Sequence, residues 1–491
     1  MSHLRYLLGV DFGGSSSKAT LLGEDGRVYA AAVSEYPTYY PRNGWAEQDP
    51  EDSYAALCRN VRDILSRTGV APEDIAALAL DAATHTAVLL DGQDRPVRRA
   101  IYWTDTRASE EAAYLRQTMN DALIEECFNS VSSLWTLPQL MWLKAHEPET
   151  LSRTRRLMAM KDYVRFRLTG DFVTDNIEAM GFMLQDARSG VWSEKLCAMA
   201  GLPAEALPEV VSPVQALSPL TAQACADTGL SARTMVIAGA TDTVMEVYAA
   251  GAVNPGQATV KLATAGRICA ITDHAVVDPR LVTYRHVKDG LWYPGTATKS
   301  AAASNRWYRD TFGGSFDEMS EQAASAPRGC EGLFFHPYLQ GEITPYLDDR
   351  LRASFTGVAG YHTKAHFNRA VLEGVGYSMK DCMSTLKELG IAPGEAVALG
   401  GGMKSPLWRQ IMADMLAIPL KTVDSVDSSL GSAMLAGVAC GVFDSHEAAV
   451  ARCVHETGCT RPDPEGVAFY DAKFSVYRQI QRALAPVYDA L

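Results

Sequence analysis

The sequence of 491 residues has no excess of basic residues: 45 Lys and Arg stand against 58 Asp and Glu, and the formal net charge is -13. Nucleic acid is therefore not an expected partner, because a phosphate backbone binds to a basic surface. Long apolar runs are absent too, since polar or charged residues interrupt each apolar stretch before the roughly 20 residues that a membrane helix needs. We expect no membrane partner.

Signals for export are also missing. The apolar run near the N-terminus is short and Asp11 interrupts it, so it does not resemble the apolar core of a signal peptide. The ten cysteines are scattered and include no C-x-x-C pair, which is typical of reduced thiols. We therefore expect a cytoplasmic protein.

The sequence does contain enough apolar residues for large cores, 47% of the chain against 21% charged residues. A chain of this length exceeds one ordinary core, and two large lobes suit it. Residues 4–36 indicate a strand, a Gly-rich turn and a hairpin, and residues 50–69 carry apolar side chains at helical spacing. Residues 74–91 then indicate a pair of strands.

The second half of the chain repeats this order. Residues 254–273 again indicate a strand, a turn with Thr and Gly, and a strand. An apolar helix is expected at residues 366–390, and residues 395–417 indicate a strand, a glycine triplet and a helix. We predict an α/β fold with two lobes, each a mixed sheet flanked by helices, and expect a nucleotide to bind between the lobes at the glycine turns. The lobes would comprise residues 1–248 and 249–491.

The first Gly-rich turn has the composition of a phosphate-binding loop. Asp11 ends the first strand, and Gly13 and Gly14 allow the backbone to approach a ligand closely. Ser15 and Lys18 add a hydroxyl group and a cation. Backbone N–H groups in such a turn bind phosphate, while Asp11 can hold Mg²⁺ through water. The alternative is a polar hairpin turn without a ligand.

Two glycine- and threonine-containing turns in the second half have a related composition. Thr264 lies in a turn of small residues between two β-rich runs, which predicts a second phosphate loop or an ordinary hairpin. Gly401 and Ser405 lie between an apolar strand and a helix, where a flat ligand can rest against bare backbone. The glycine triplet is the more specific of the two signals.

Asp242 follows the apolar run at residues 234–239, which places a carboxylate at the carboxyl end of a strand. Proteins of the α/β class collect their active groups there. Phosphoryl transfer to a hydroxyl needs a base that accepts the hydroxyl proton during attack, and a carboxylate can do this. The alternative is an Asp that caps the following helix.

A small polar set in the first half could bind sugar hydroxyls. His85 lies among alternating apolar residues, and Trp103 and Asp105 lie close together upstream of Arg107. An imidazole, an aromatic ring and a carboxylate together suit a sugar. The alternatives are a histidine satisfied within a strand, and packing plus a salt bridge between Asp105 and Arg107.

These segments occur in one order that resembles the FGGY family of carbohydrate kinases, most closely its xylulokinase branch, from about residue 6 to about residue 440. The matching segments are DFGGSSSK at 11–18, WAEQDP at 45–50, THTAVLLD at 84–91, YWTDTR at 102–107, PQLMWLKAHEPE at 138–149, KDYVRFRLTGDFVTDNIEA at 161–179, GATD at 239–242, KLATAG at 261–266, PYLQGEITPY at 337–346 and GGGMKSPLWRQIMAD at 400–414.

The resemblance implies an actin-like, ribonuclease H-like pair of lobes with an ATP and sugar cleft between them. It implies ATP and Mg²⁺ as cofactors and a terminal hydroxyl of a small sugar as the acceptor, with D-xylulose converted to D-xylulose 5-phosphate. Asp242 would be the catalytic base and a sugar contact, and Asp11 the residue tied to Mg²⁺. The other implied contacts are, for ATP, Gly13, Gly14, Ser15, Lys18, Thr264, Gly401 and Ser405 and, for the sugar, Thr84, His85, Trp103 and Asp105.

The sequence departs from the family pattern mainly where the substrate would bind. The usual Gly-Asp-Asn turn at the base is replaced by Thr241, Asp242 and Thr243, and the usual glycine of the second phosphate loop by Ala263. The further departures are Ala83 and Thr84 for a usual Gln-Met pair, Gln139 for Lys, and Ile343 for Arg. A mismatched polar group can change sugar preference by several kcal/mol, so the choice of sugar is open.

The sequence leaves open the sugar, the class of protein and the oligomeric state. The sugar could instead be L-xylulose, ribulose, a pentitol, glycerol or gluconate. A non-catalytic sugar or nucleotide sensor, or an actin-like ATPase that acts in motion or assembly, could use the same fold. Relatives are often dimers, so by analogy we expect a homodimer.

Overall fold

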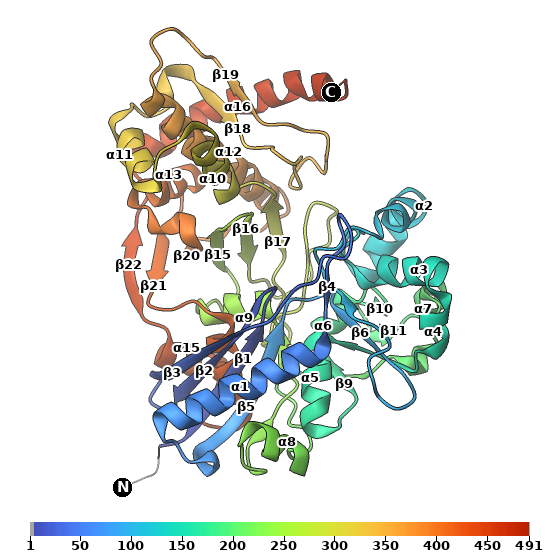
Figure 1. The fold of residues 1–491 in the computed structure, drawn as a ribbon. Coiled ribbons are helices and arrows are strands. Elements are labelled where there is room, and N and C mark those ends of the chain that lie inside the picture. The colour runs from blue at the N-terminus through green and yellow to red at the C-terminus, as the bar shows by residue number, and fades with distance from the viewer. Residues whose placement is uncertain (1–3, 491) are drawn as a thin grey trace. The chain divides into compact units, whose positions relative to one another are not determined.

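The computed structural model describes residues 4–490, and its contacts divide the chain into two compact units. The first unit contains the chain up to residue 253 together with residues 284–291 and 425–455. The second contains residues 254–283, 292–424 and the C-terminal segment from residue 456. Figure 1 labels the elements and colours the chain from blue at the N-terminus to red at the C-terminus.

A mixed sheet is the centre of the first unit. The strands β1 (Tyr6–Phe12), β2 (Ser16–Gly23) and β3 (Val28–Glu35) form an antiparallel meander. On the other side of β1, β5 (Ile75–Ala82) pairs with it in parallel, and β13 (Met235–Val236) and β14 (Ala240–Thr241) pair in parallel with β5. The carboxyl ends of β1, β5 and β14 therefore meet at one edge.

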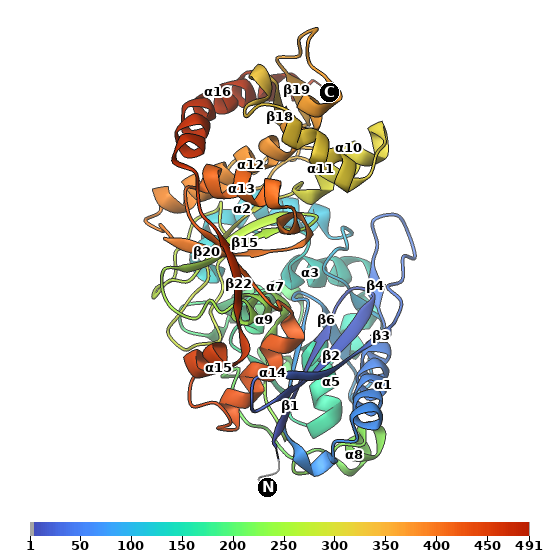
Figure 2. The ribbon, with the colours of Figure 1, turned by 90° about the vertical axis from the view of Figure 1, so that its left-hand side faces the viewer.

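Alternation along β1 directs its side chains to two helices, one on each face of the sheet. Leu8 and Val10 belong to the core under α1 (Pro50–Thr68), which begins at the capping residue Asp49 and ends before Gly69. Gly9 faces α14 (Ser428–Ala439), which returns to this unit from far along the chain. Figure 2 shows the two helices on either side of β1 and β2.

The rest of the first unit consists of helices and short strands. They are β4 (Glu47–Gln48), β6 (Ala87–Leu90), β7 (Ala100–Ile101), α2 (Ser109–Cys127), α3 (Thr136–His146), α4 (Pro148–Arg153), β8 (Arg156–Ala159), α5 (Met160–Thr169), β9 (Val173–Asp175), α6 (Glu178–Gly181), β10 (Gln185–Asp186), β11 (Val191–Trp192), α7 (Glu194–Ala200), β12 (Glu209–Val211), α8 (Ala222–Thr228), α9 (Asp242–Ala249) and α15 (His446–Cys453), with short 3₁₀ helices at Pro72–Asp74 and Ala204–Ala206.

The second unit has a sheet of the same strand order. The strands β17 (Gly295–Thr298), β16 (Gly266–Ala270) and β15 (Gln257–Leu262) form the antiparallel part, and β20 (Glu395–Leu399) and β21 (Leu420–Val423) continue it in parallel. The added strand β22 (Glu456–Thr460) pairs antiparallel with β21. Both units thus join an antiparallel meander to parallel strands through their first strand.

The helices of the second unit include the long α12 (Lys364–Glu388), whose buried side chains belong to the main core of this unit. The other elements are α10 (Ala302–Phe312), α11 (Phe316–Ser325), a 3₁₀ helix η3 (Cys330–Gly332), β18 (Phe334–His336), β19 (Ser354–Thr356), a 3₁₀ helix η4 (Gly401–Lys404), α13 (Pro406–Leu416) and α16 (Pro464–Tyr488).

The predicted α/β class and the two sheet-containing units are confirmed. One pairing differs: residues 74–91 were expected to form a strand pair, but β6 pairs with β8, because a turn through residues 83–86 leads it away from β5. The predicted division after residue 248 stays a prediction. In the structure, residues 284–291 and 425–455 lie beyond that boundary but belong to the first unit. Among residues 4–490, no helix is long and apolar enough to cross a membrane.

Candidate active site

The turn between β1 and β2 is held by side chains that bind its carbonyl groups. The Tyr36 hydroxyl donates to the Gly13 carbonyl at 2.6 Å, and the Gln48 amide lies 3.3 Å from the carbonyls of Gly13 and Gly14. The Thr38 hydroxyl also donates to the Gly14 carbonyl. Because these acceptors are already engaged, fewer carbonyl dipoles are left to repel an anion at this turn. This arrangement suits the predicted phosphate loop.

Ser15 and Lys18 take different positions beside this turn. Ser15 is exposed at the tip of the turn. Lys18 is paired with Asp11 in the strand register, and its ammonium group forms an ion pair with Asp427, the residue that caps α14. A phosphate that approaches Lys18 would therefore compete with the carboxylate of Asp427.

Four carboxyl groups gather at the shared strand edge: Asp11 on β1, Asp81 on β5, Asp242 on α9 and Asp427. Burial and the charge of Asp242 raise the pKa of Asp11 to about 7. Burial also raises the pKa of Asp81 well above its ordinary value, and Asp81 shares a hydrogen bond with Asp11 and accepts one from Ser432 at 2.5 Å. Such a group of acids favours protons or a cation.

Asp81 was missed by the sequence interpretation. It has no exposed surface. The available signal was its position, because a carboxylate directly after the apolar run of β5 mirrors Asp11 after β1.

The raised pKa of Asp11 predicts a pH-dependent stability effect of Asp11→Asn. An acid whose pKa is raised on folding stabilises the fold fully below its ordinary pKa, and this contribution is lost as the pH rises towards 7. Asn imitates the protonated acid, so we expect the variant to be more stable than the native protein at pH 8, by on the order of 1–2 kcal/mol at this half-buried position.

Thermal unfolding without nucleotide or metal, measured at pH 5 and at pH 8, tests this effect. The gain should be largest at pH 8 and less than half as large at pH 5, because the loss begins just above the ordinary pKa of 3.8 and is nearly complete above the folded-state pKa of about 7. Asp444→Asn removes an exposed acid of the same unit and serves as the control. An Asp11→Asn protein that gains nothing at pH 8 would contradict the charge repulsion inferred for this edge.

Asp242 is the first residue of α9, directly after β14. The pairing of Ala240 with Asp81 and of Thr241 with Ala82 brings Asp242 to the edge where Asp11 lies. The backbone N–H of Thr243 donates to Oδ1 of Asp242 at 2.6 Å, and the Thr243 hydroxyl lies 3.2 Å from the same oxygen. The Thr that replaces the usual Asn thus orients the carboxylate.

The predicted sugar pair, Thr84 and His85, follows the end of β5. His85 has a φ of 66° and is almost fully buried. Its Nδ1 lies 2.9 Å from the Gly181 carbonyl and its Nε2 3.1 Å from the Tyr284 hydroxyl, while the Trp135 ring packs edge-on at 4.4 Å between centroids. The ring is therefore fixed from both nitrogens. Tyr284 and Trp135 carried no signal in the sequence, because only the fold brings them to His85.

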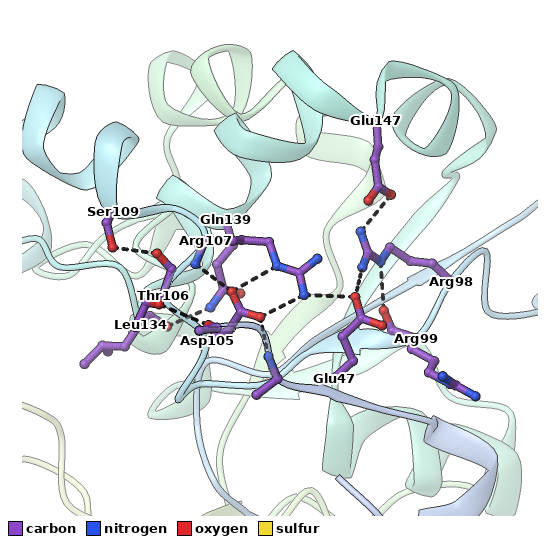
Figure 3. Close-up of polar contacts among 12 residues, drawn as sticks. Glu47, Arg98, Arg99, Asp105, Thr106, Arg107, Ser109, Leu134, Gln139 and Glu147 are labelled. Atoms are coloured by element: carbon purple, nitrogen blue, oxygen red, sulfur yellow. Dashed lines mark hydrogen bonds and ion pairs between the residues drawn. The ribbon is translucent and has the colours of Figure 1, made fainter. Parts of the chain in front are cut away.

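Trp103 and Asp105 differ in what they can contact. Trp103 is 40% exposed, so its ring is available to a ligand. Asp105 is 2% exposed, and its carboxylate accepts from the Ala46 N–H at 2.6 Å and from the Arg107 guanidinium at 2.8 and 2.9 Å. Figure 3 shows Asp105 among these donors, with Arg107 also reaching Glu47. These contacts favour a role for Asp105 in holding this loop, and its contact with the sugar stays a prediction.

Gln139, which stands where the family usually has Lys, belongs to the same region. It is 2% exposed, and its amide donates to the Leu134 carbonyl at 3.2 Å. Figure 3 draws Gln139 together with Arg107, whose guanidinium lies 5.1 Å from the ring of Trp142 on the same helix α3. The guanidinium of Arg107 stacks on the Trp45 ring at 3.8 Å, so a cation is already present here.

The second unit contains a cavity of about 660 Å³. Its lining includes all three residues predicted there for the nucleotide, Thr264, Gly401 and Ser405. The remaining residues of the lining are Leu262, Ala263, Ala302, Asn305, Arg306, Phe316, Asp317, Met319, Ser320, Asn368, Leu372, Gly402, Lys404, Pro406 and Trp408. A cavity of this size with apolar walls and a few polar groups suits a small ligand such as a nucleotide.

Each glycine of the triplet has a different environment. A Cβ atom on Gly400 would lie 2.5 Å from the Leu262 carbonyl, and one on Gly402 would lie 2.9 Å from the Leu262 Cβ. A Cβ on Gly401 would meet nothing within 4 Å, so this residue presents bare backbone to the cavity. Ser405 accepts from the Trp408 N–H at 3.3 Å and caps α13.

Gly401→Val places a branched side chain in this cavity without a clash against the protein. We expect the KM for ATP to rise roughly 10–100-fold, because added atoms occupy ligand space, while the KM for the sugar changes little. Initial rates at varied ATP and saturating sugar measure this change. Gly394→Val, at an exposed site of the same unit where a Cβ also meets nothing, is the control. An unchanged KM for ATP would place the nucleotide elsewhere.

The acidic strand edge of the first unit and the cavity of the second unit suit a phosphotransferase, and sequence comparison gives the family. The N-terminal domain of the FGGY family of carbohydrate kinases matches residues 6–248 and the C-terminal domain residues 267–440. The chain belongs to the FGGY family of carbohydrate kinases and is an ATP-dependent carbohydrate kinase.

Relatives and solved structures cover nearly the whole chain. The xylulose kinase of Bacillus subtilis (strain 168) is 31% identical over 97% of both chains. The ligand-bound xylulose kinase from Lactobacillus acidophilus is 25% identical, with a TM-score of 0.94 over 99% of both chains. The gluconate kinase from Lactobacillus acidophilus is 26% identical with the same TM-score and coverage.

Proposed function

We propose that the chain transfers the γ-phosphoryl group of ATP to a terminal hydroxyl of D-xylulose and forms D-xylulose 5-phosphate. The observation that carries this proposal is the similarity to the Bacillus subtilis xylulose kinase along 97% of both chains. His85, which the family resemblance implies as a sugar contact and which Gly181 and Tyr284 hold, supports it. A homodimer and a cytoplasmic location stay predictions.

In the proposed mechanism Asp242 accepts the proton of the sugar hydroxyl as this oxygen attacks the γ-phosphorus. The N–H and the hydroxyl of Thr243 bind one carboxylate oxygen of Asp242 and hold the group in one orientation for this role. Mg²⁺, when bound, would neutralise charge on the phosphate oxygens, and Asp11 at the acidic edge would hold it. A cation fits there because it removes the repulsion that raises the pKa of Asp11.

The remaining residues would bind the two substrates. We propose that Gly13, Gly14, Ser15 and Lys18 hold phosphate oxygens, and that Thr264, Gly401 and Ser405 hold ATP in the cavity of the second unit. Thr84, His85 and Trp103 would contact the sugar. Because the Gly181 carbonyl and the Tyr284 hydroxyl hold both nitrogens of His85, its ring would act on sugar choice mainly through its fixed position and shape.

A coupled ADP-release assay with Mg²⁺ and ATP tests the proposal against D-xylulose, L-xylulose, ribulose, pentitols, glycerol and gluconate. The highest kcat/KM with D-xylulose supports it. A preference for gluconate would agree with the similarity to gluconate kinase and overturn the choice of sugar, with Ala83 and Thr84 as the first residues to examine. No stimulation by any sugar would support the sensor alternative.

A further inference from the structure

A cluster of five ionisable residues lies fully buried in the first unit: Lys161, Asp162, Arg165, Asp175 and Glu178. Lys161 pairs with Asp162 at 2.5 Å and with Asp175 at 2.6 Å, and Arg165 pairs with Asp162 at 2.7 Å. Two cations thus balance two carboxylates through direct ion pairs. The third acid, Glu178, takes part in none of these pairs.

Glu178 is the first residue of α6. A hydrogen bond holds its backbone N–H, whereas its carboxyl group has no such bond within the described residues. Its N–H donates to Oδ1 of Asp175 at 3.0 Å. Both carboxyl oxygens are buried and have no hydrogen-bond partner within residues 4–490. Burial, with the charges of Asp162, Asp175 and Asp242 added, raises its pKa well above the ordinary value although Lys161 opposes this. Burial therefore disfavours the charged form of this carboxyl group, and its protonated form can both donate and accept a hydrogen bond.

The position of Gly181 shows what this acid faces. A Cβ atom built on Gly181 would lie 3.6 Å from Oε1 of Glu178, 3.5 Å from Nδ1 of His85 and 3.6 Å from Cβ of Thr84. The carboxyl group of Glu178 and the side chains of Thr84 and His85 therefore all border the position that a side chain on Gly181 would occupy. Asp242 is also close enough for its charge to act on Glu178.

We propose that Glu178 is a specificity-determining residue whose carboxyl group forms hydrogen bonds with the sugar at the place bordered by Gly181, Thr84 and His85. The inference rests on the proposed binding of the sugar at Thr84 and His85. A hydroxyl group both donates and accepts, which matches a neutral carboxyl group. A buried polar group without a partner is unfavourable, and a sugar that supplies one gains affinity over an analogue that does not.

The matched variants Glu178→Gln and Glu178→Leu separate hydrogen bonding from shape. Gln keeps a donor, an acceptor and nearly the same shape, so we expect its sugar KM to stay within about 3-fold of the native value. Leu keeps bulk but no polar group, and we expect its sugar KM to rise roughly 10–100-fold with a much smaller change in kcat and in the KM for ATP. Steady-state kinetics with the best sugar of the panel gives these values.

Deoxy analogues of that sugar identify the partner group. Removal of the hydroxyl that Glu178 contacts should raise the KM of the native protein and of the Gln variant, but cause little further loss in the Leu variant. Gly181→Ala offers a second test if the Leu variant does not fold. Its methyl group makes only ordinary contacts and enters the same place, so it should raise the sugar KM as well.

A purely structural role gives a different result. The Leu variant would then unfold more easily, with an unchanged sugar KM and an equal response of all proteins to each deoxy analogue, and this would overturn the inference. This result can be told apart from an error in the proposed substrate. If gluconate rather than D-xylulose gave the highest kcat/KM, the proposed substrate would fail, and the same variants measured with gluconate would still decide the role of Glu178.

Discussion

Asp242→Asn lowers kcat by roughly 10²–10⁴-fold while the binding of nucleotide and sugar is kept, because an amide cannot accept the proton that the sugar hydroxyl must lose. The side-chain oxygen of Asn can still accept from the N–H and the hydroxyl of Thr243, so α9 begins as before. The change also removes one charge that acts on Asp11. We therefore expect a folded, ligand-binding protein with little turnover.

Initial rates of ADP release, together with calorimetric titration of nucleotide and sugar, measure this expectation. Asp444→Asn removes a charge at an exposed position of the same unit and should retain native turnover. Near-native turnover of Asp242→Asn would show that another group takes the proton. A folded variant that loses both turnover and sugar binding would instead assign Asp242 to binding alone.

Local sequence patterns predicted the elements that carry most of the site. The apolar runs of β1 and β2, the turn at Gly13 and Gly14 and the apolar spacing of α1 are features of neighbouring residues, and each is present in the structure. The same holds for β20, the glycine triplet and α13 in the second unit, where Thr264, Gly401 and Ser405 line one cavity. A short segment suffices to predict such elements, because local backbone hydrogen bonds and the period of the apolar side chains define a strand, a turn or a helix.

What the sequence did not predict depends on contacts between distant segments. The pairing of Asp105 with Arg107 was one of the expected alternatives, but the second donor to its carboxylate, the Ala46 N–H, comes from a distant segment. Tyr284 reaches His85 only because residues 284–291 contact the first unit. Glu178 owes its raised pKa to burial, which no motif records. Each case follows from burial and long-range packing rather than from residue type.

The return of α14 to β1 is the largest of these long-range features, and Gly9 makes it possible. A Cβ atom on Gly9 would lie 1.9 Å from the Ser429 carbonyl oxygen and 2.4 Å from the Ala433 nitrogen, and both of these are backbone atoms. Neither can move without the helix. Since α14 also brings Ser432 to Asp81, its position bears directly on the acidic edge of the site.

We expect Gly9→Ala to reduce the free energy of unfolding by about 3 kcal/mol or more, because a close backbone approach must open along the helix. Turnover should fall with it even where the protein is still folded, since a displaced α14 also moves Asp427 away from Lys18. Urea unfolding followed by circular dichroism and ADP release at low urea measure the two effects. Gly92→Ala, where a Cβ meets only one side-chain atom at 3.9 Å, is the control. If Gly9→Ala were as stable as the native protein, α14 would not pack closely on β1. The position of the acidic edge would then not depend on this helix.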